Sequence, residues 1–311
     1  MRTMNAVRID AFGGPEVVHL ERIPVPMPRA GELLLKIRAA SVNPVDYKIR
    51  SGKYPAVTAE QLPYVLGRDV CGDVDACGPN VAAFAEGDPL YAFLGVDRGG
   101  YAEYVIVKEN EASRKPSTLD SVSAAAVPLA GLTAWQGLFQ HGGLKSQQRV
   151  LIHAGSGGVG HFAIQFAKAR GAHVITTVSG QNVDFVRELG ADEVINYKKQ
   201  RFENEIRDVD MVFDLIGGET QDRSWGVLKK GGILVSTLNP PSQEKAIAHG
   251  VRAMRYTAEV SGSELGEIAG LIDAGKVKPF VSKRFALKDA ISALQSVEQG
   301  HTQGKVVLTI A

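Results

Sequence analysis

The chain has 311 residues, of which 44% are hydrophobic and 22% charged, and its formal net charge is +1. These values are typical of a soluble globular protein with two domains. The near-neutral charge and the lack of a long basic run argue against nucleic acid or an anionic membrane surface as the main partner.

Cysteine usage and the N-terminal residues bear on the cellular compartment. Cys71 and Cys77 are the only cysteines, too few for a disulfide framework or a four-cysteine zinc site, and we expect both to be small buried residues. Residues 1–14 contain no apolar run typical of a secretory signal. The most apolar stretch, residues 124–135, is short and contains Pro128, so it predicts no membrane span. We therefore expect a cytoplasmic location.

Residues 1–124 are predicted to be mainly β. Leu33–Ala39 and Tyr101–Val107 are rich in β-forming residues, and the stretches between such runs are dense in Gly, Pro and Asn. Short strands between closely spaced turns are typical of a small or partly open barrel.

From about residue 125 the pattern changes to alternating strands and helices, which predicts a doubly wound parallel sheet over residues 125–274. Glycines after the predicted helices favour helix ends there. The expected strands are Val150–Ile152, His173–Val178, Glu193–Asn196, Met211–Ile216 and Ile233–Thr237, and the expected helices are Gly158–Ala169, Val183–Leu189 and Gln221–Leu228, the last ended by Gly231 and Gly232.

The last part of the chain again carries its own pattern. Gly262–Ala274 is predicted to be a helix that Gly275–Pro279 ends. Two predicted strands, Phe280–Phe285 and Lys305–Ile310, flank a helix over Leu287–Glu298. We expect residues 275–311 to return to the first domain and complete it.

The most informative stretch is Val150–Lys168, which reads VLIHAGSGGVGHFAIQFAK. Gly155, Gly157 and Gly160 fill the pattern G-x-G-x-x-G between a predicted strand and a predicted helix, the context that indicates a dinucleotide site. In such a site the glycines allow a tight turn, close approach of a pyrophosphate and close helix packing, and the helix N-terminus faces the phosphates. Ser156, Gly158 and Val159 complete this loop. The alternative is an ordinary glycine-rich turn.

The next strand end indicates which dinucleotide is bound. An acidic residue at this corner would bind the ribose 2′-hydroxyl of NAD, and residues 176–182 contain none. Ser179 and Gly180 leave room for a 2′-phosphate, so the sequence favours NADPH, although the usual arginine is also missing. Tyr197 and Lys198 end the following strand and can reach the same place, but Lys198 is equally explained as a solvated surface charge.

Three further residues are candidate contacts of the nicotinamide half of the cofactor. Leu238 and Asn239 follow the strand Ile233–Thr237, where a parallel sheet delivers its loops to the ligand, and their backbone can hold the carboxamide. Thr133 can contact the nicotinamide, or else cap a helix.

Several segments carry a resemblance to a known family. They are Ser41–Gly52 (SVNPVDYKIRSG), Gly67–Asp88 (beginning GRDVCGDV), Pro128–Ala134 (PLAGLTA), Gly275–Pro279 (GKVKP) and Gly300–Leu308 (GHTQGKVVL). Together they resemble the zinc-free medium-chain reductases, namely quinone oxidoreductases and their alkenal or enone reductase relatives. The resemblance covers essentially the whole chain.

The resemblance implies a GroES-like β-rich catalytic domain beside a Rossmann cofactor domain, with the substrate between them over the nicotinamide. It also implies a homodimer, and apolar alternation in Ile233–Thr237 and Tyr256–Val260 predicts sheet-edge pairing with the second copy. The zinc-dependent relatives carry a cysteine and a Gly-His-Glu segment. This chain has no cysteine in Asn43–Asp46 and has Gly67-Arg68-Asp69 instead, so we expect no catalytic zinc.

The expected chemistry follows from the missing metal ligands. Reduction of a ketone needs a Lewis acid or a proton relay, whereas quinones and α,β-unsaturated carbonyls spread the charge and need only positioning and a few hydrogen-bond donors. The sequence thus predicts an NADPH-dependent reductase of a small quinone or enone. Two alternatives are an NADPH-binding redox sensor with little turnover and a zinc-type alcohol dehydrogenase.

Candidate catalytic donors lie between residues 43 and 54. Asn43 can orient the substrate or the nicotinamide ribose, or else is a turn residue before Pro44. Tyr47 and Tyr54 can donate a proton to the substrate oxygen, or else are structural tyrosines. Asp46 is expected to be a hydrogen-bond acceptor rather than a base.

One histidine also follows a strand of the cofactor domain. His153 comes directly after the apolar run Val150–Ile152. We expect it to be a core or cleft histidine rather than a catalyst.

Overall fold

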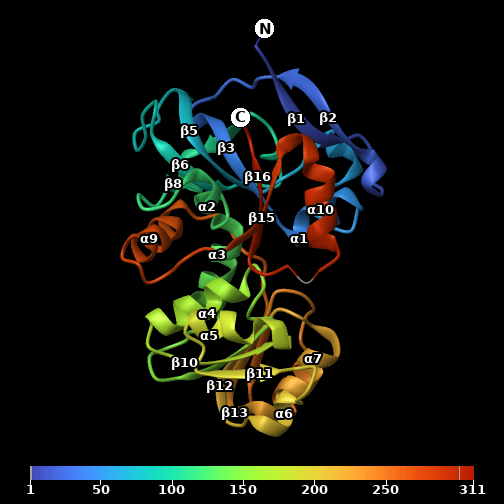
Figure 1. Cartoon of the computed structure of the whole chain (residues 1–311), viewed down its shortest axis with the longest axis vertical. Helices are drawn as coiled ribbons and strands as arrows, with labels where there is room; N and C mark the ends of the chain where they lie inside the picture. The colour runs from blue at the N-terminus through green and yellow to red at the C-terminus, as the bar shows by residue number, and fades with distance from the viewer. Residues whose placement is uncertain (1, 301) are drawn as a thin grey trace. The chain divides into compact units, whose positions relative to one another are not determined.

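The computed structural model describes residues 2–300 and 302–311 (Figure 1). Met1 and His301, the latter within the family segment Gly300–Leu308, lie outside the described residues. The chain divides into two compact units. The first holds the residues up to Leu129 together with 260–275 and 279–311, and the second holds Ala130–Glu259 with Lys276–Lys278.

The first unit is rich in β-structure, as the sequence predicts. Its larger sheet has the strand order β15-β16-β3-β5-β6-β8, with β7 paired to β3, and its smaller sheet has the order β2-β1-β4. The strands are β1 (Thr3–Ile9), β2 (Val18–Pro24), β3 (Glu32–Val42), β4 (Tyr64–Val65), β5 (Asp69–Cys77), β6 (Pro89–Phe93), β7 (Tyr104–Lys108), β8 (Ala112–Arg114), β15 (Val281–Ala286) and β16 (Lys305–Thr309).

Residues 279–311 complete this unit, whereas Lys276–Lys278, which the sequence analysis grouped with them, fall in the second unit. Strand β16 pairs antiparallel with β3, with Val306 opposite Val42. The first unit's helices are α1 (Pro44–Arg50), α2 (Ser121–Ala125), α9 (Gly262–Asp273) and α10 (Ala290–Glu298). Helices α1 and α10 lie side by side (Figure 1). Arg50 of α1 forms an ion pair with Glu298 of α10 at 3.1 Å.

Helix α9 falls in the first unit, whereas the sequence analysis grouped it with residues 125–274. The reason is close packing on strands of the first unit. Tyr91 Oη donates to the carbonyl of Leu265 at 2.6 Å. A Cβ at Gly262 would lie 2.3 Å from the carbonyl oxygen of Ala112, so only glycine permits this approach.

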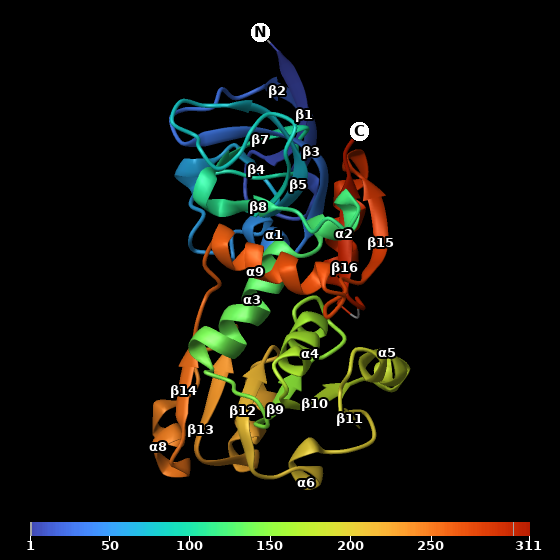
Figure 2. The same ribbon diagram turned by 90° about the vertical axis from the view of Figure 1, so that its left-hand side faces the viewer.

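The second unit contains the doubly wound parallel sheet that the sequence predicts. Its strand order is β11-β10-β9-β12-β13-β14, and every neighbouring pair is parallel. Figure 2 shows these strands from β14 at the left to β11 at the right. They are β9 (Arg149–His153), β10 (His173–Val178), β11 (Glu193–Asn196), β12 (Val209–Asp214), β13 (Leu228–Ser236) and β14 (Arg252–Arg255).

The connecting helices of this unit end where the sequence indicates. Gly171 and Gly190 follow α4 and α5 with φ of +79° and +100°, a conformation that favours glycine. The helices are α4 (Gly160–Ala169), α5 (Val183–Glu188), α6 (Phe202–Glu205), α7 (Gly218–Arg223) and α8 (Gln243–His249), and α3 (Pro128–Trp135) carries the chain from the first unit into the second. No helix in the described ranges is long and apolar enough to cross a membrane.

Two sequence predictions about this sheet are wrong. The predicted helix Gln221–Leu228 is instead α7 followed by a 3₁₀ turn over Ser224–Val227, and Gly231 and Gly232 lie inside β13. They are tolerated there because Gly231 has φ of +78° and the pairing with β12 shifts register at this end of the strand.

The stretches expected to form a free sheet edge do not do so. Ile233–Thr237 belongs largely to β13, which has β12 on one side and β14 on the other. Tyr256–Val260 is not a strand, because Tyr256 turns inward, is buried, and donates its hydroxyl to the carbonyl of Thr133. The free edges of this sheet are β11 and β14.

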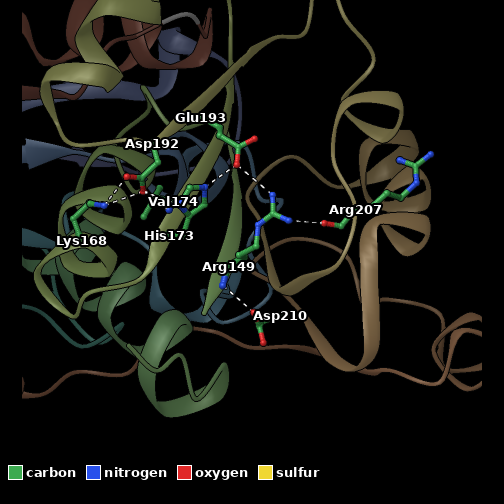
Figure 3. Close-up of polar contacts among 8 residues, drawn as sticks. All are labelled: Arg149, Lys168, His173, Val174, Asp192, Glu193, Arg207 and Asp210. Atoms are coloured by element: carbon green, nitrogen blue, oxygen red, sulfur yellow. Dashed lines mark hydrogen bonds and ion pairs between the residues drawn. The ribbon is translucent and has the colours of Figure 1, made fainter. Parts of the chain in front are cut away.

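An ionic network joins the amino ends of the parallel strands (Figure 3). Glu193 Oε1 lies 3.2 Å from Arg149 and 2.7 Å from His173 Nε2. Asp192 pairs with Lys168 at 2.8 Å and accepts from the backbone N–H of Val174 at 2.7 Å. These side chains are partly exposed, so each pair contributes little stability. In open parallel sheets ligands bind at the opposite edge, outside the carboxyl ends of the strands.

Candidate functional site

The glycine-rich loop connects β9 to α4 at the carboxyl edge of the second unit's sheet. A Cβ at Gly155 would lie 2.0 Å from Thr176 Oγ1, and one at Gly160 would lie 2.2 Å from the Ala154 carbonyl oxygen. Thr176 in turn donates to the carbonyl of Ile152 at 2.8 Å. Both glycines are therefore required for the loop to pack this closely on the strands.

The middle of this loop has the properties of a phosphate cradle. At Gly157 a Cβ would approach only the Ala154 carbonyl, at 3.3 Å, so one face of the residue is open. Within the described part of the chain, the backbone N–H groups of Ser156, Gly158 and Val159 have no hydrogen-bond acceptor. Unpaired N–H groups beside a helix N-terminus fit a bound pyrophosphate.

Ser179 and a residue that the sequence analysis missed connect this loop to the corner after β10. Asn182 Nδ2 donates to Ser156 Oγ at 3.0 Å and to Ser179 Oγ at 3.1 Å. Ser179 is buried, with 8% exposure, and Asn182 is half-buried. The sequence signal that could have identified Asn182 is a short amide side chain three residues after Ser179, in a corner without an acidic residue.

The predicted contacts of the 2′-phosphate come together at the ends of β10 and β11. Val178 pairs with Asn196, and the N–H of Tyr197 donates to the carbonyl of Val178 at 3.1 Å. Gly180 is exposed, and a Cβ there would lie 2.8 Å from Asn196 Nδ2. Tyr197 is 54% exposed, and Lys198 beside it is also exposed.

The loop after β13 holds Leu238 and Asn239 at the same carboxyl edge. The Leu238 carbonyl accepts from Arg255 Nε at 3.1 Å, and the Asn239 carbonyl accepts from Gln221 Nε2 at 3.1 Å. Gln221 also donates to the buried Asp214 at 2.9 Å. The loop is thus fixed from both sides, with its two carbonyl groups already engaged.

Thr133 lies within α3, five residues beyond its first residue Pro128. The helix-capping alternative for Thr133 is therefore wrong. The side chain is buried, with 7% exposure.

His153 is a core residue. It has no exposed surface, and its ring nitrogens are hydrogen-bonded with Thr177 Oγ1 at 3.0 Å and Ser224 Oγ at 2.9 Å. Burial, opposed by the charge of Asp214, lowers the pKa of His153 from 6.5 to about 4. A neutral, hydrogen-bonded imidazole in this position is structural, which confirms the core interpretation.

In the first unit, Asn43 belongs to a buried polar cluster with Asp69 and Lys305. Asn43 is 2% exposed and its Nδ2 donates to Asp69 Oδ2 at 2.8 Å, while the Lys305 ammonium donates to Asn43 Oδ1. Lys305 Nζ lies 3.7 Å from Asp69 Oδ2. Asp69 also accepts from Ser41 Oγ at 2.6 Å and from the N–H of Leu129 at 2.7 Å. Both amide atoms of Asn43 are therefore occupied by protein groups.

Asp46 lies next to this cluster and is fully buried. Its Oδ2 accepts from the N–H of Asn43 at 2.7 Å and from Tyr101 Oη at 2.8 Å. Burial raises the pKa of Asp46 to about 7, against the effect of these two hydrogen bonds. Asp46 therefore caps α1 from inside the fold, as the structural interpretation of this residue predicts.

Tyr47 and Tyr54 are both half-buried and pack against the core of the first unit. Burial, aided by the negative charge of Glu298, raises the pKa of Tyr47. A phenol is protonated at neutral pH even at its ordinary pKa, so Tyr47 can act as a hydrogen-bond donor.

The cysteines are free thiols. Cys71 is buried and burial raises its pKa to about 12, whereas Cys77 is half-buried with its Sγ 3.8 Å from the carbonyl oxygen of Phe84. The expectation of burial is thus confirmed for Cys71 only.

Among residues 2–300 and 302–311, no three His, Cys, Asp or Glu side chains lie close enough together to hold a metal ion.

Two family models match the chain. The alcohol dehydrogenase GroES-like domain matches residues 29–117, and the zinc-binding dehydrogenase model matches residues 189–308. The first match confirms that the β-rich unit is GroES-like.

Curated relatives match over nearly the whole chain. The mitochondrial NAD(P)H oxidoreductase RTN4IP1 of Danio rerio is 34% identical over 99% of this chain and 91% of its own length. The quinone oxidoreductase of Rattus norvegicus is 32% identical over 98% of this chain and 96% of its own length.

Solved structures match equally well. The quinone oxidoreductase of Coxiella burnetii superposes with a TM-score of 0.93 at 37% identity and covers 100% of both chains. The Escherichia coli quinone oxidoreductase complexed with NADPH superposes with a TM-score of 0.89 at 29% identity, over 98% of this chain and 99% of its own.

Proposed function

Because the chain belongs to the medium-chain dehydrogenase/reductase family, in its quinone oxidoreductase branch, we propose that it is an NADPH-dependent oxidoreductase that works without zinc. Its acceptor is a quinone or the C=C bond of an α,β-unsaturated carbonyl. The names of the relatives agree with an oxidoreductase that uses a nicotinamide cofactor, since they include an NAD(P)H oxidoreductase and an NADPH complex.

The observation that carries this proposal is the loop after β9. Its open glycine face and unpaired N–H groups fit a pyrophosphate, and the corner after β10 offers Ser179 and Gly180 where an acidic residue would repel a 2′-phosphate. When bound, NADPH supplies the hydride. In this proposal the backbone N–H groups of the loop Gly155–Gly160 hold the pyrophosphate. Ser179, Gly180 and Tyr197 hold the 2′-phosphate, and Thr133, Leu238 and Asn239 contact the nicotinamide half.

The protein's remaining task is to donate a proton to the acceptor. Hydride addition to a quinone or enone places negative charge on the carbonyl oxygen, and one hydrogen-bond donor is enough to stabilise it. We assign this role to Tyr47, whose phenol is protonated at neutral pH, with Tyr54 as the second candidate. Asn43 acts in the same proposal by fixing the segment that carries both tyrosines, because its amide is bonded to Asp69 and Lys305.

Zinc independence is proposed on the chemistry of the residues at the metal-ligand segments. Asn43 and Asp69 are bonded to each other and to Lys305, a cation. Arg68 donates its Nε to the carbonyl of Leu94 at 2.8 Å and covers the ring of Phe93. A guanidinium and an ammonium are positively charged donors and do not bind zinc.

The test is NADPH consumption by purified, chelator-treated protein, followed by absorbance with benzoquinone, naphthoquinone and short α,β-unsaturated aldehydes and ketones as acceptors. Turnover that prefers NADPH to NADH and survives the chelator is expected. Loss of turnover on chelation, with recovery on added zinc, contradicts the zinc-free proposal. Tight NADPH binding without turnover on any acceptor moves the assignment to a redox sensor.

Assembly and location are further proposals. A homodimer is proposed on the resemblance to the family. Light scattering coupled to size-exclusion chromatography of the purified protein tests it.

A cytoplasmic location is proposed on the two free thiols. Cell fractionation tests it, since relatives with mitochondrial and chloroplastic names exist.

A further inference from the structure

Asn182 joins two parts of the candidate cofactor site that are far apart in sequence. Its Nδ2 donates to Oγ of Ser156, in the glycine-rich loop, at 3.0 Å and to Oγ of Ser179, after β10, at 3.1 Å. The backbone N–H of Asn182 also donates to the Ser179 carbonyl at 3.0 Å. One amide group thus holds two hydroxyl oxygens in place.

These contacts determine where the hydroxyl protons can go. A serine hydroxyl carries one donor and accepts through its oxygen. Because both oxygens accept a hydrogen bond from Asn182, both O–H groups can donate to another acceptor. Neither Ser156 nor Ser179 donates its hydroxyl to any group in the part of the chain that the structure describes. The corner therefore presents two oriented O–H donors, an arrangement suited to an anion.

We infer that Asn182 sets the preference for NADPH over NADH, an inference that rests on the proposed function. Its amide orients the hydroxyls of Ser156 and Ser179 so that both donate to the 2′-phosphate. Asn182 is a positioning residue in this account, and the two serines make the contact. This mechanism explains how a corner without an arginine can select a phosphate, since no charged side chain occurs in residues 176–182.

The account predicts that an isosteric change reverses the preference. In Asn182→Asp the carboxylate only accepts hydrogen bonds. The carboxylate accepts hydrogen bonds from both serine hydroxyls, so neither hydroxyl can donate to a phosphate. It also adds a negative charge that repels the phosphate. A ribose 2′-hydroxyl, in contrast, can donate to the new carboxylate, as it does in NAD-selective sites.

The experiment measures dissociation constants of NADPH, NADH, 2′,5′-ADP and 5′-AMP for the natural chain and three variants. Asn182→Asp is expected to weaken NADPH and 2′,5′-ADP by about thirtyfold or more, and to leave NADH and 5′-AMP within about threefold or tighter. Asn182→Ala removes the amide without adding charge, and is expected to weaken the two phosphorylated ligands by about fivefold.

Gln181→Glu is the matched control, because it adds the same charge on the exposed neighbouring side chain. It is expected to change NADPH affinity by less than about threefold, since an exposed charge is screened by water and salt. If Gln181→Glu weakens NADPH as much as Asn182→Asp, net charge is responsible and the inference is wrong.

The remaining outcomes separate this inference from the proposed function. If the natural chain binds NADPH and both Asn182 variants bind it equally well, the inference fails and the proposed function stands. If the natural chain binds neither nucleotide, the proposed function fails and the inference with it. Circular dichroism checks that each variant is folded. If Asn182→Asp does not fold, the affinities of Asn182→Ala decide.

Discussion

Acidification is expected to destabilise the second unit through His153. This imidazole is completely buried and is hydrogen-bonded with the hydroxyl oxygens of Thr177 and Ser224. Its charged form is disfavoured in the fold, where burial lowers its pKa to about 4, but not in the unfolded chain, where the pKa is near 6.5. Between these two values the unfolded chain binds more protons than the folded one.

The sign and magnitude follow by linkage. Stability contributed by neutral His153 is complete above pH 6.5 and is lost as the pH falls toward 4. The difference between the two pKa values corresponds to a loss of about 3 kcal/mol below both pKa values, and of about 2 kcal/mol at pH 5. This is a large fraction of the stability of an ordinary domain.

Tryptophan fluorescence isolates this unit, because Trp135 and Trp225 are the only tryptophans and both lie in it. Urea unfolding of the natural chain at several pH values is compared with that of His153→Gln, which cannot titrate, and of His19→Gln, a control that keeps His153. His153→Gln is expected to lose most of the pH dependence between pH 6.5 and 4, and His19→Gln to retain it. Equal pH dependence in the natural chain and His153→Gln would refute the reasoning.

Gly160→Ala places a methyl group 2.2 Å from a backbone carbonyl, so we expect a cost of roughly 1–3 kcal/mol in urea unfolding and weaker NADPH binding; unchanged values for both contradict the packing argument. Lys305→Met leaves the buried Asp69 carboxylate without its cation and is expected to cost about 3–5 kcal/mol, part of which Asp69→Asn restores in the double variant; circular dichroism during unfolding measures both, and a fully stable single variant refutes the role of the pair. Tyr47→Phe with Tyr54→Phe is expected to lower kcat at least about tenfold with NADPH affinity retained, and unchanged turnover removes the tyrosines as proton donors.

The sequence predicted the second unit well because its signals are local. Glycine with positive φ ends α4 and α5 at Gly171 and Gly190, and three glycines mark the loop before α4. The errors arose where a long-range contact decides the structure. Gly231 sits inside β13 because the neighbouring strand shifts register there, and Tyr256 turns inward to reach the Thr133 carbonyl.

The candidate site was predictable only in part for a related reason. The cofactor loop is a contiguous motif, so its residues could be named from their spacing. The link from Asn182 to Ser156 and the cluster of Asn43, Asp69 and Lys305 depend on contacts across 26 to 262 residues of sequence. Without these contacts Asn43 could be interpreted as a substrate-orienting residue, whereas its amide is already bonded within the protein.

The central claim, zinc-free reduction by NADPH, is tested most directly by a single-turnover experiment. Chelator-treated protein is loaded with one equivalent of NADPH and mixed rapidly with naphthoquinone, and the absorbance of the reduced nicotinamide is followed. The account predicts complete loss of this absorbance in one phase that added zinc does not accelerate. Retention of the absorbance, with NADPH shown to be bound, would contradict it.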